Sequence, residues 1–116
     1  MTIKATESNQ PFRLAPSFVL SSNTGLTLQF TSPSGTVTTH TKASSPAVTA
    51  PAVALTNDPE LGDVAASTYF ELFTTTTTFT EAGTWTACGK YTDTATTPDT
   101  IIETLPVTFT IGESCF

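Results

Sequence analysis

Apolar side chains recur at every second position through much of this sequence, and this period decides what the chain can fold into. Near the C-terminus, Leu105, Val107, Phe109 and Ile111 alternate with other residues until Gly112. A period of two places such side chains on one face of an extended strand, whereas a helix needs apolar positions three and four residues apart. The pattern therefore predicts a half-buried β-strand that stops at Gly112.

A second alternating segment predicts a hairpin. Leu26, Leu28 and Phe30 share one face, and residues 32–35 that follow read Ser-Pro-Ser-Gly. Proline at the second position and glycine at the fourth are favoured in tight turns. We therefore expect the chain to reverse here and residues 36–41 to pair with the preceding strand.

The remaining strands are expected at residues 12–20, 52–55, 69–80, 85–91 and from 101 onward. Pro16 favours an edge position or a bend in the first of these, because proline lacks a backbone donor. Residues 59–67 could form one helical turn or an irregular loop, and residues 41–51 a long connection. Seven or so short strands separated by turns are typical of an antiparallel β-sandwich.

Threonine is unusually abundant, with 28 of the 116 residues, whereas charged residues make up only 12%. Threonine suits the solvent face of a strand, because its branched carbon fits the pleat and its hydroxyl stays hydrated. A chain of this length forms one domain with a single core.

Charge and hydropathy exclude several functional classes. The formal net charge is −6, and the four basic residues are Lys4, Arg13, Lys42 and Lys90, far apart in sequence. Such a chain cannot easily build a surface that neutralises phosphates, so we expect no nucleic-acid partner. The first eight residues are polar and no long apolar stretch follows, so we expect neither an export leader nor a membrane span.

Few residues can carry chemistry. His40 is the single histidine, so any pair with a nucleophilic serine or cysteine would need it, yet its alternating strand favours an exposed or rim position. The residues Asn57, Asp58, Glu60 and Asp63 could offer oxygen ligands to calcium, but their spacing does not match a twelve-residue calcium loop. We expect a solvated acidic loop here, and no catalytic residue, metal or cofactor.

Cys88 and Cys115 permit one disulfide. If a hairpin closes near residues 95–97, Cys88 faces the region of Thr104, and Cys115 lies well beyond it along the last strand. Because a disulfide needs α-carbons within about 7 Å, we expect two free thiols.

The aromatic residues Trp85, Tyr91 and Phe116 allow two interpretations. They could form a platform on which a sugar stacks. Trp85 shares its strand face with Ala87 and Gly89, however, which favours a central position in the core of a sandwich.

Two motifs resemble a known family. Residues 28–37 read Leu-Gln-Phe-Thr-Ser-Pro-Ser-Gly-Thr-Val, and residues 81–85 read Glu-Ala-Gly-Thr-Trp. This combination resembles the small immunoglobulin-like domains of tailed-bacteriophage structural proteins, over residues 24–112. The resemblance implies an immunoglobulin-like β-sandwich. Unlike in antibody domains, no cysteine pair brackets the tryptophan, so the resemblance implies no disulfide between the sheets.

The same resemblance implies a virion protein that catalyses nothing. A capsid decoration or cement protein that binds coat subunits is the first expectation, and a neck or tail protein (adaptor, baseplate or fibre) is the alternative. Its partners would be other virion proteins and further copies of itself, assembled in the bacterial cytoplasm. A surface carbohydrate-binding or adhesive module is a competing class, and an enzyme would need His40 and a carboxylate to meet in a cleft.

Within this interpretation, residues 1–11 form an extended arm and residues 12–116 form the sandwich domain. Removal of residues 1–10 should then abolish assembly and leave the melting temperature nearly unchanged. The expected interface residues are Thr2, Ile3, Lys4, Phe12, Cys115 and Phe116. The expected core residues are Leu28, Phe30, Trp85, Tyr91, Val107 and Phe109.

Overall fold

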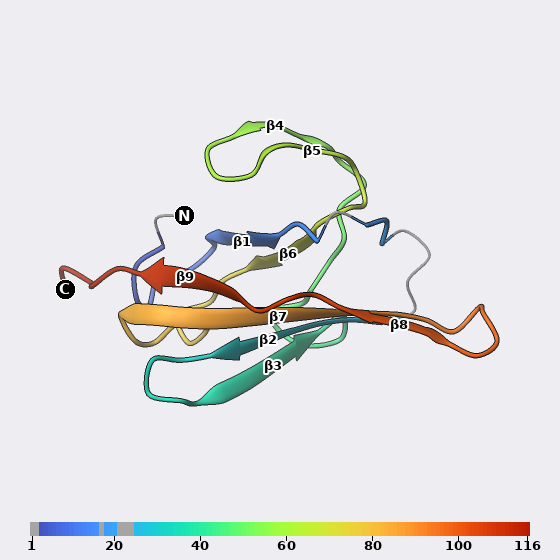
Figure 1. The fold of residues 1–116 in the computed structure, drawn as a ribbon. Coiled ribbons are helices and arrows are strands. Elements are labelled where there is room, and N and C mark those ends of the chain that lie inside the picture. Colours follow the sequence, from blue (N-terminus) through green and yellow to red (C-terminus); the bar gives the residue numbers. More distant parts are fainter. Residues whose placement is uncertain (1–2, 17, 21–24) are drawn as a thin grey trace.

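The computed structural model describes residues 3–16, 18–20 and 25–116, which form an all-β fold of antiparallel sheets (Figure 1). The strands are β1 (Pro11–Leu14), β2 (Gly25–Thr31), β3 (Val37–Thr41), β4 (Leu55–Asp58), β5 (Gly62–Val64), β6 (Phe70–Phe73), β7 (Gly83–Asp93), β8 (Thr100–Glu103) and β9 (Val107–Ile111). The expected all-β antiparallel class is confirmed, with nine strands in the described part of the chain rather than about seven. These residues include no helix long and apolar enough to cross a membrane.

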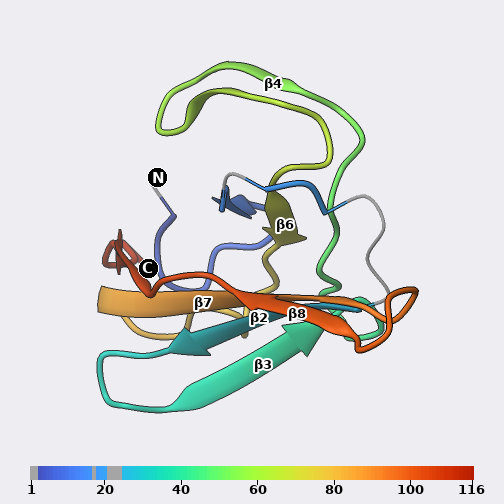
Figure 2. The ribbon, with the colours of Figure 1, turned by 45° about the vertical axis from the view of Figure 1, so that its right-hand side comes forward.

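The strands are distributed over three sheets. The largest has the order β3-β2-β7-β8, and β9 also pairs with β7. β1 pairs with β6, and β4 pairs with β5. Figures 1 and 2 show β1 and β6 lying over one face of the large sheet, with the β4–β5 hairpin further out on the same side. The core therefore lies between the large sheet and the β1–β6 pair.

Aromatic rings from both layers fill this core. The Phe12 ring of β1 lies 5.0 Å from Phe30 of β2 and 4.9 Å from Phe109 of β9, between ring centroids. Phe79 joins the same cluster, 4.9 Å from Phe30 and 5.1 Å from Trp85. Most of these rings meet edge to face, an arrangement that aromatic quadrupoles favour.

Five of the six expected core residues lie in or against the core, and one does not. The structure buries Leu28, Phe30, Trp85 and Tyr91, and Phe109 packs half-buried against them. Val107 is exposed over 40% of its surface and is not a core residue. It lies on an outer strand of the large sheet, beside an irregularity of the pairing with β7.

This irregularity is a β-bulge between β8 and β9. Lys90 pairs with Glu103 and Ala87 pairs with Val107, so two residues of β7 lie opposite residues 104–106. The additional residue interrupts the ladder, and a proline is tolerated there because that position need not donate. Strict alternation placed Leu105 on the core face, but in the bulge it is 84% exposed.

The threonine run after β6 does not continue the strand as expected for residues 69–80. β6 ends at Phe73, and the chain turns at once. The Thr78 amide donates to the Thr75 carbonyl at 3.2 Å, and the Thr75 amide donates to Thr78 Oγ1 at 2.9 Å. Threonine hydroxyls compete in this way with the hydrogen bonds of a sheet, which explains the early end of β6.

Residues 59–67 contain part of a hairpin instead of a helical turn. The Asp58 carboxylate accepts the amides of Glu60 and Leu61 at 3.0 and 2.9 Å and thereby closes the turn between β4 and β5. Gly62 follows with a φ of +69°, which glycine adopts without strain. An aspartate that can cap a helix also stabilises a tight turn, and here the turn continues into β5.

The segment before β1 is not a free arm. The Gly112 amide donates to the Ile3 carbonyl at 3.0 Å, and the Ala5 amide donates back to the Gly112 carbonyl at 2.9 Å. The Thr6 and Asn9 amides donate to the carbonyls of Phe79 and Thr74 at 2.8 and 2.7 Å. Residues 3–10 thus belong to the domain itself, which corrects the expected boundary between residues 11 and 12.

Candidate interaction surface

Exposed aliphatic side chains gather along one outer strand of the large sheet. They come from β8, the bulge and β9, and they are Ile101, Ile102, Leu105 and Val107. We call residues 101–107 with these side chains the β8–β9 margin. Ile101 and Ile102 are adjacent on β8 and therefore point to opposite faces of the sheet, so this apolar surface extends around the sheet edge. Exposed apolar side chains that gather in this way can mark an interaction site.

The residues expected at an interface fall into separate groups. Ile3 and Phe12 are only 4% and 2% exposed, so they stabilise their own domain and cannot meet a partner, which corrects the expectation. Lys4, Cys115 and Phe116 are exposed. Thr2 lies outside the described residues. Lys4 forms a parallel bridge with Gly112, so the exposed members lie on or beside the C-terminal segment, whereas Ile3 and Phe12 belong to the core.

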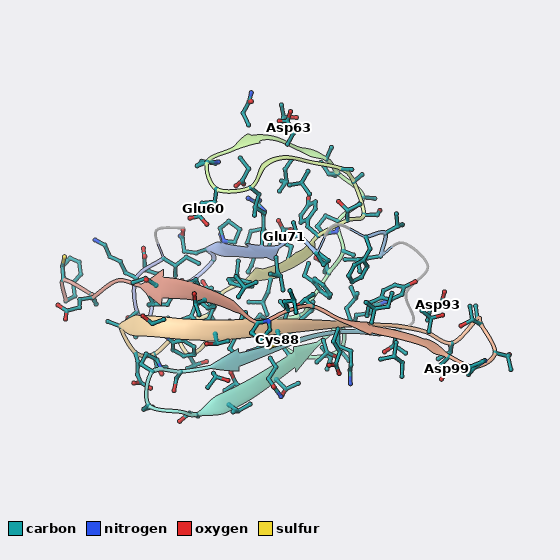
Figure 3. All side chains as sticks on the ribbon, in the orientation of Figure 1. Glu60, Asp63, Glu71, Cys88, Asp93 and Asp99 are labelled. Atoms are coloured by element: carbon teal, nitrogen blue, oxygen red, sulfur yellow. The ribbon has the colours of Figure 1, made fainter. Side chains whose placement is uncertain are left out.

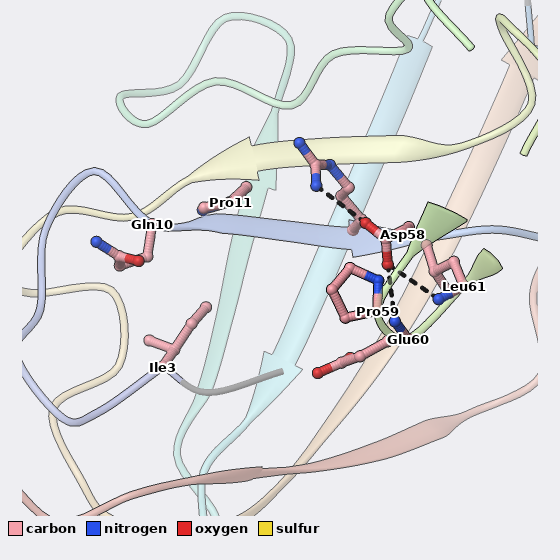
Figure 4. Close-up of a pocket in the computed structure, with 8 residues that line it drawn as sticks. Ile3, Gln10, Pro11, Asp58, Pro59, Glu60 and Leu61 are labelled. Carbon is pink, nitrogen blue, oxygen red and sulfur yellow. Dashed lines mark hydrogen bonds and ion pairs between the residues drawn. The ribbon is translucent and has the colours of Figure 1, made fainter. Parts of the chain in front are cut away.

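An ion cluster connects the β4–β5 hairpin to the β1–β6 sheet. Arg13 Nε donates to Glu71 Oε2 at 2.8 Å. Arg13 Nη1 donates to Asp58 Oδ2 at 3.2 Å, and a dashed line in Figure 4 marks this contact. Burial alone would lower the pKa of Arg13, but the hydrogen bond to Glu71 and the charges of Glu71 and Asp58 raise it. Tyr69 holds the segment that leads into this hairpin, because its hydroxyl donates to the Val53 carbonyl at 2.8 Å.

A pocket of about 380 Å³ lies between β1 and this hairpin (Figure 4). Its apolar lining comes from Ile3, Pro11, Pro59 and Leu61, and its polar lining includes Arg13. The guanidinium of Arg13 already pairs with two carboxylates, Asp58 and Glu71. The polar lining of the pocket is therefore part of a structural ion cluster. This is not the convergent set of nucleophile, base and oxyanion donors that a catalytic site requires.

The acidic group on β4 and β5 serves the hairpin. Besides its bonds within the turn, Asp58 binds Arg13, and Asp63 Oδ1 accepts the Asn57 amide at 2.9 Å. Among residues 3–16, 18–20 and 25–116, no three His, Cys, Asp or Glu side chains are arranged to hold a metal ion. The carboxylates of Asp58 and Asp63 therefore act locally, as partners of backbone amides and, for Asp58, of one arginine.

His40 faces the core side of β3. Its ring lies 5.5 Å from the Phe30 ring, and its Nε2 atom is buried with no hydrogen-bond partner in the described part of the chain. Burial lowers the pKa of His40, and a hydrogen bond with the Pro46 backbone partly opposes this effect. No serine or cysteine among those residues donates to Nε2, so the nucleophilic pair considered from the sequence is not assembled here.

Cys88 and Cys115 are both free thiols, as the sequence analysis expected. Cys88 is half-buried on β7, and Cys115 is exposed after β9. Trp85 is 3% exposed and its indole N–H donates to the Glu81 carbonyl at 2.9 Å. With Trp85 and Tyr91 buried, these two rings form no exposed platform for a sugar.

Sequence reasoning missed the β8–β9 margin as a surface. Two signals for it were present: Ile101 and Ile102 are adjacent, which a half-buried strand does not need, and Pro106 interrupts the following alternation. Together they are typical of an edge strand with a bulge.

No family model, curated protein or solved structure matches this chain.

Proposed function

We propose that this chain is a non-enzymatic structural protein of a tailed-bacteriophage virion, and within that class a capsid decoration or cement protein that binds coat subunits. The observation that carries the proposal is the β8–β9 margin, where Leu105 is 84% exposed. A protein that works by assembly needs such an apolar surface, because burial of apolar area drives most protein association.

The resemblance in residues 28–37 and 81–85 supports the same proposal. In the structure these motifs become the β2–β3 hairpin and the start of β7. Ser34 Oγ donates to Glu81 Oε2 at 2.5 Å, and a Cβ on Gly83 would lie 2.9 Å from Pro33 Cγ. The two motifs that suggest an immunoglobulin-like domain therefore lie next to each other in one sheet, as a shared structural unit would require. An immunoglobulin-like relationship is accordingly part of the proposal.

The surface chemistry also favours assembly. Charged residues make up 12% of the chain, and threonines lie opposite each other on β2, β3, β7 and β9 of the large sheet. Hydroxyls cost less to remove from water than ions do, so partner subunits can cover such a surface at a small desolvation penalty. The proposed partners are coat subunits and further copies of this chain, and the proposed site of assembly is the bacterial cytoplasm.

The experiment is to locate the protein on virus particles. Antibodies raised against the purified chain should label intact particles in electron microscopy. Label over the capsid supports a decoration protein, whereas label confined to the neck or tail moves the protein to that part of the virion. Particles produced without this chain should also bind the purified protein in co-sedimentation. Failure of both assays would rule out a virion role.

A further inference from the structure

The two edges of the large sheet differ in how they are protected from an added strand. Along β8 and β9 the bulge interrupts the ladder, Pro106 offers no backbone donor, and Glu103 places a charge on the strand. These are devices by which proteins protect sheet edges. β3 forms the opposite edge (Figures 1 and 2), and its residues 37–41 include no proline and no charge, in an unbroken register with β2. Only the β3 edge therefore suits an added strand.

The backbone of β3 presents free hydrogen-bonding groups at this edge. The Thr36 carbonyl accepts the Ser32 amide at 2.9 Å, so the Thr36 backbone faces β2. Because the facing of the backbone alternates along an antiparallel pair, every second residue after Thr36 also bonds to β2. Val37 and Thr39 lie between them and point their N–H and C=O groups outward. No described strand pairs with β3 on that side.

The free stretch of this edge has two fixed ends. After it, the Thr41 amide donates to Ser44 Oγ at 2.9 Å, and the Thr41 carbonyl accepts the Val48 amide at 2.9 Å. Before it, the chain turns back into β2 at Gly35. An added strand therefore has room only along residues 36–40, and a longer strand would meet the segment that is bonded to Thr41.

The β3 strand of a second copy matches this stretch in length and in hydrogen bonding. The centre of residues 36–40 is Thr38. If an antiparallel second copy is related by a two-fold axis at Thr38, Val37 of one copy faces Thr39 of the other, and all the outward N–H and C=O groups of both residues are paired. Gly35 of the second copy then lies opposite Thr41, where it brings no side chain to the occupied end. An edge with this arrangement is complementary to itself, which a two-fold interface requires.

The side chains of this register are compatible as well. Val37 lies beside Thr39 of the second copy and Thr38 lies beside its own equivalent, and β-branched cross-strand pairs stabilise a sheet. β3 is uncharged, and Lys42 after it would face Ser34, so no charges oppose each other. The acidic side chains labelled in Figure 3 lie on the β4–β5 hairpin, on β6 and at the β7–β8 end, away from β3.

We propose that β3 pairs with β3 of a second copy in an antiparallel ladder around a two-fold axis at Thr38, so that one sheet continues through both copies. The proposal rests on the self-association included in the proposed function, and it names the strand, the register and the symmetry. The ladder is short and buries less area than a standard interface, so we expect a dissociation constant of about 1 mM or somewhat lower. Copies held side by side on a particle pair at this affinity because their effective concentration is high.

A charge exchange at the axis tests the proposal. Analytical ultracentrifugation of the purified chain up to about 2 mM should show a monomer–dimer equilibrium. Thr38 is exposed, so charged variants of it should fold. Thr38→Lys and Thr38→Glu should each raise the dissociation constant at least about tenfold, because like charges then meet at the axis. An equimolar mixture of the two variants should dimerise again, since lysine then faces glutamate. Thr84→Lys, at an exposed threonine of the inner strand β7, is the matched control and should leave the equilibrium unchanged.

A backbone substitution separates strand pairing from side-chain contact. Thr39→Pro removes an outward amide and leaves the hydrogen bonds to β2 in place, so it should abolish the dimer. Thr39→Val keeps that amide and should retain the dimer. Circular dichroism should show both variants folded.

A cysteine cross-link tests the two-fold axis itself. In a background with Cys88→Ser and Cys115→Ser, Thr38→Cys should form a disulfide-linked dimer under mild oxidation. Facing residues of a pair without mutual hydrogen bonds have α-carbons about 4.5 Å apart, which a disulfide can bridge. Thr84→Cys in that background should remain monomeric. A wild-type chain that stays monomeric at about 2 mM, a mixture of Thr38→Lys and Thr38→Glu that does not dimerise, or equal cross-linking of both cysteines would overturn the proposal.

The two proposals fail separately. A monomeric chain that nevertheless labels virus particles would leave the virion role in place and assign the β3 edge to a strand of a coat subunit, against the two-copy ladder. A Thr38-dependent dimer that is absent from particles would retain this ladder and contradict the proposed function.

Discussion

At the scale of single residues, Thr74 shows how a hydroxyl in a threonine-rich chain becomes structural. It is buried; its Oγ1 accepts the Gln10 amide at 3.1 Å and donates to the Glu7 carbonyl at 3.0 Å. Thr74→Val keeps the shape and removes both bonds, so we expect a loss of about 1–2 kcal/mol in the free energy of unfolding. Urea denaturation measures it.

Thr76→Val provides the control for this substitution. Thr76 belongs to the same run but is exposed, and its replacement should change the free energy of unfolding by less than about 0.5 kcal/mol. Equal effects of the two substitutions would mean that the hydroxyl of Thr74 contributes nothing specific.

His40 should make stability depend on pH. Its pKa is lowered in the folded chain by burial, so the unfolded chain binds the proton more tightly. The stability that the neutral ring contributes is therefore complete above the ordinary pKa of about 6.5, and it is lost as the pH falls below that value toward the lowered one. We expect the melting temperature to fall between about pH 7.5 and about pH 5.5, and His40→Gln to reduce that fall. An unchanged slope in the variant would exclude His40 as the cause.

At the scale of elements, the segment before β1 is held to its domain by Ile3. Because Ile3 is buried, Ile3→Ala should lower the free energy of unfolding by about 2 kcal/mol, toward the lower limit for such core truncations. Ile101→Ala, at an exposed isoleucine, should change it by less than about 0.5 kcal/mol. Thermal unfolding of both variants decides the point. A negligible effect at Ile3 would restore the free arm that the sequence suggested.

The success of sequence reasoning differed between elements for physical reasons. The β2–β3 hairpin was predictable because alternation and turn chemistry both act within residues 26–41. The bulge was not predictable. One additional residue at 104–106 turns the Leu105 side chain away from the core, and only the register of pairing with β7 reveals this additional residue. Residues 3–10 show no periodicity, so their attachment to Gly112 and Phe79 depends on distant partners.

For the candidate surface, too, sequence reasoning failed where exposure depends on residues distant in sequence. Phe116 is exposed and its place at an interface stays a prediction, whereas Ile3 and Phe12 are buried by segments that are distant in sequence. Both are apolar residues near the start of the chain, and the rings that cover Phe12 come from β2, β9 and the loop after β6. A residue is free for a partner only if its own domain leaves it uncovered, and this is a long-range property.

At the scale of the whole molecule, threonines concentrate on the outer face of the large sheet. The ladder registers place threonines opposite each other across neighbouring strands, as in the pairs Thr31–Thr86, Thr86–Thr108, Thr84–Thr110 and Thr27–Thr41. These pairs lie on the face of the large sheet that points away from β1 and β6. Composition indicated that threonine would cover outer faces, but only the strand order shows that one sheet carries these pairs.

Gly89 controls how closely the two layers of the molecule approach. A Cβ at this position of β7 would lie 2.9 Å from Phe70 Cε2 on β6 and 3.2 Å from Leu14 Cδ2 on β1. Gly89→Ala should therefore separate the layers and lower the free energy of unfolding by about 1–3 kcal/mol.

Gly25→Ala is the control within the same sheet, because the nearest atom to its new Cβ is Thr92 Cβ at an ordinary 3.5 Å. This substitution should be neutral or slightly stabilising. Urea denaturation followed by Trp85 fluorescence compares the two. If Gly89→Ala proved as stable as Gly25→Ala, the approach of β1 and β6 to β7 would not be the contact that fixes the spacing of the core.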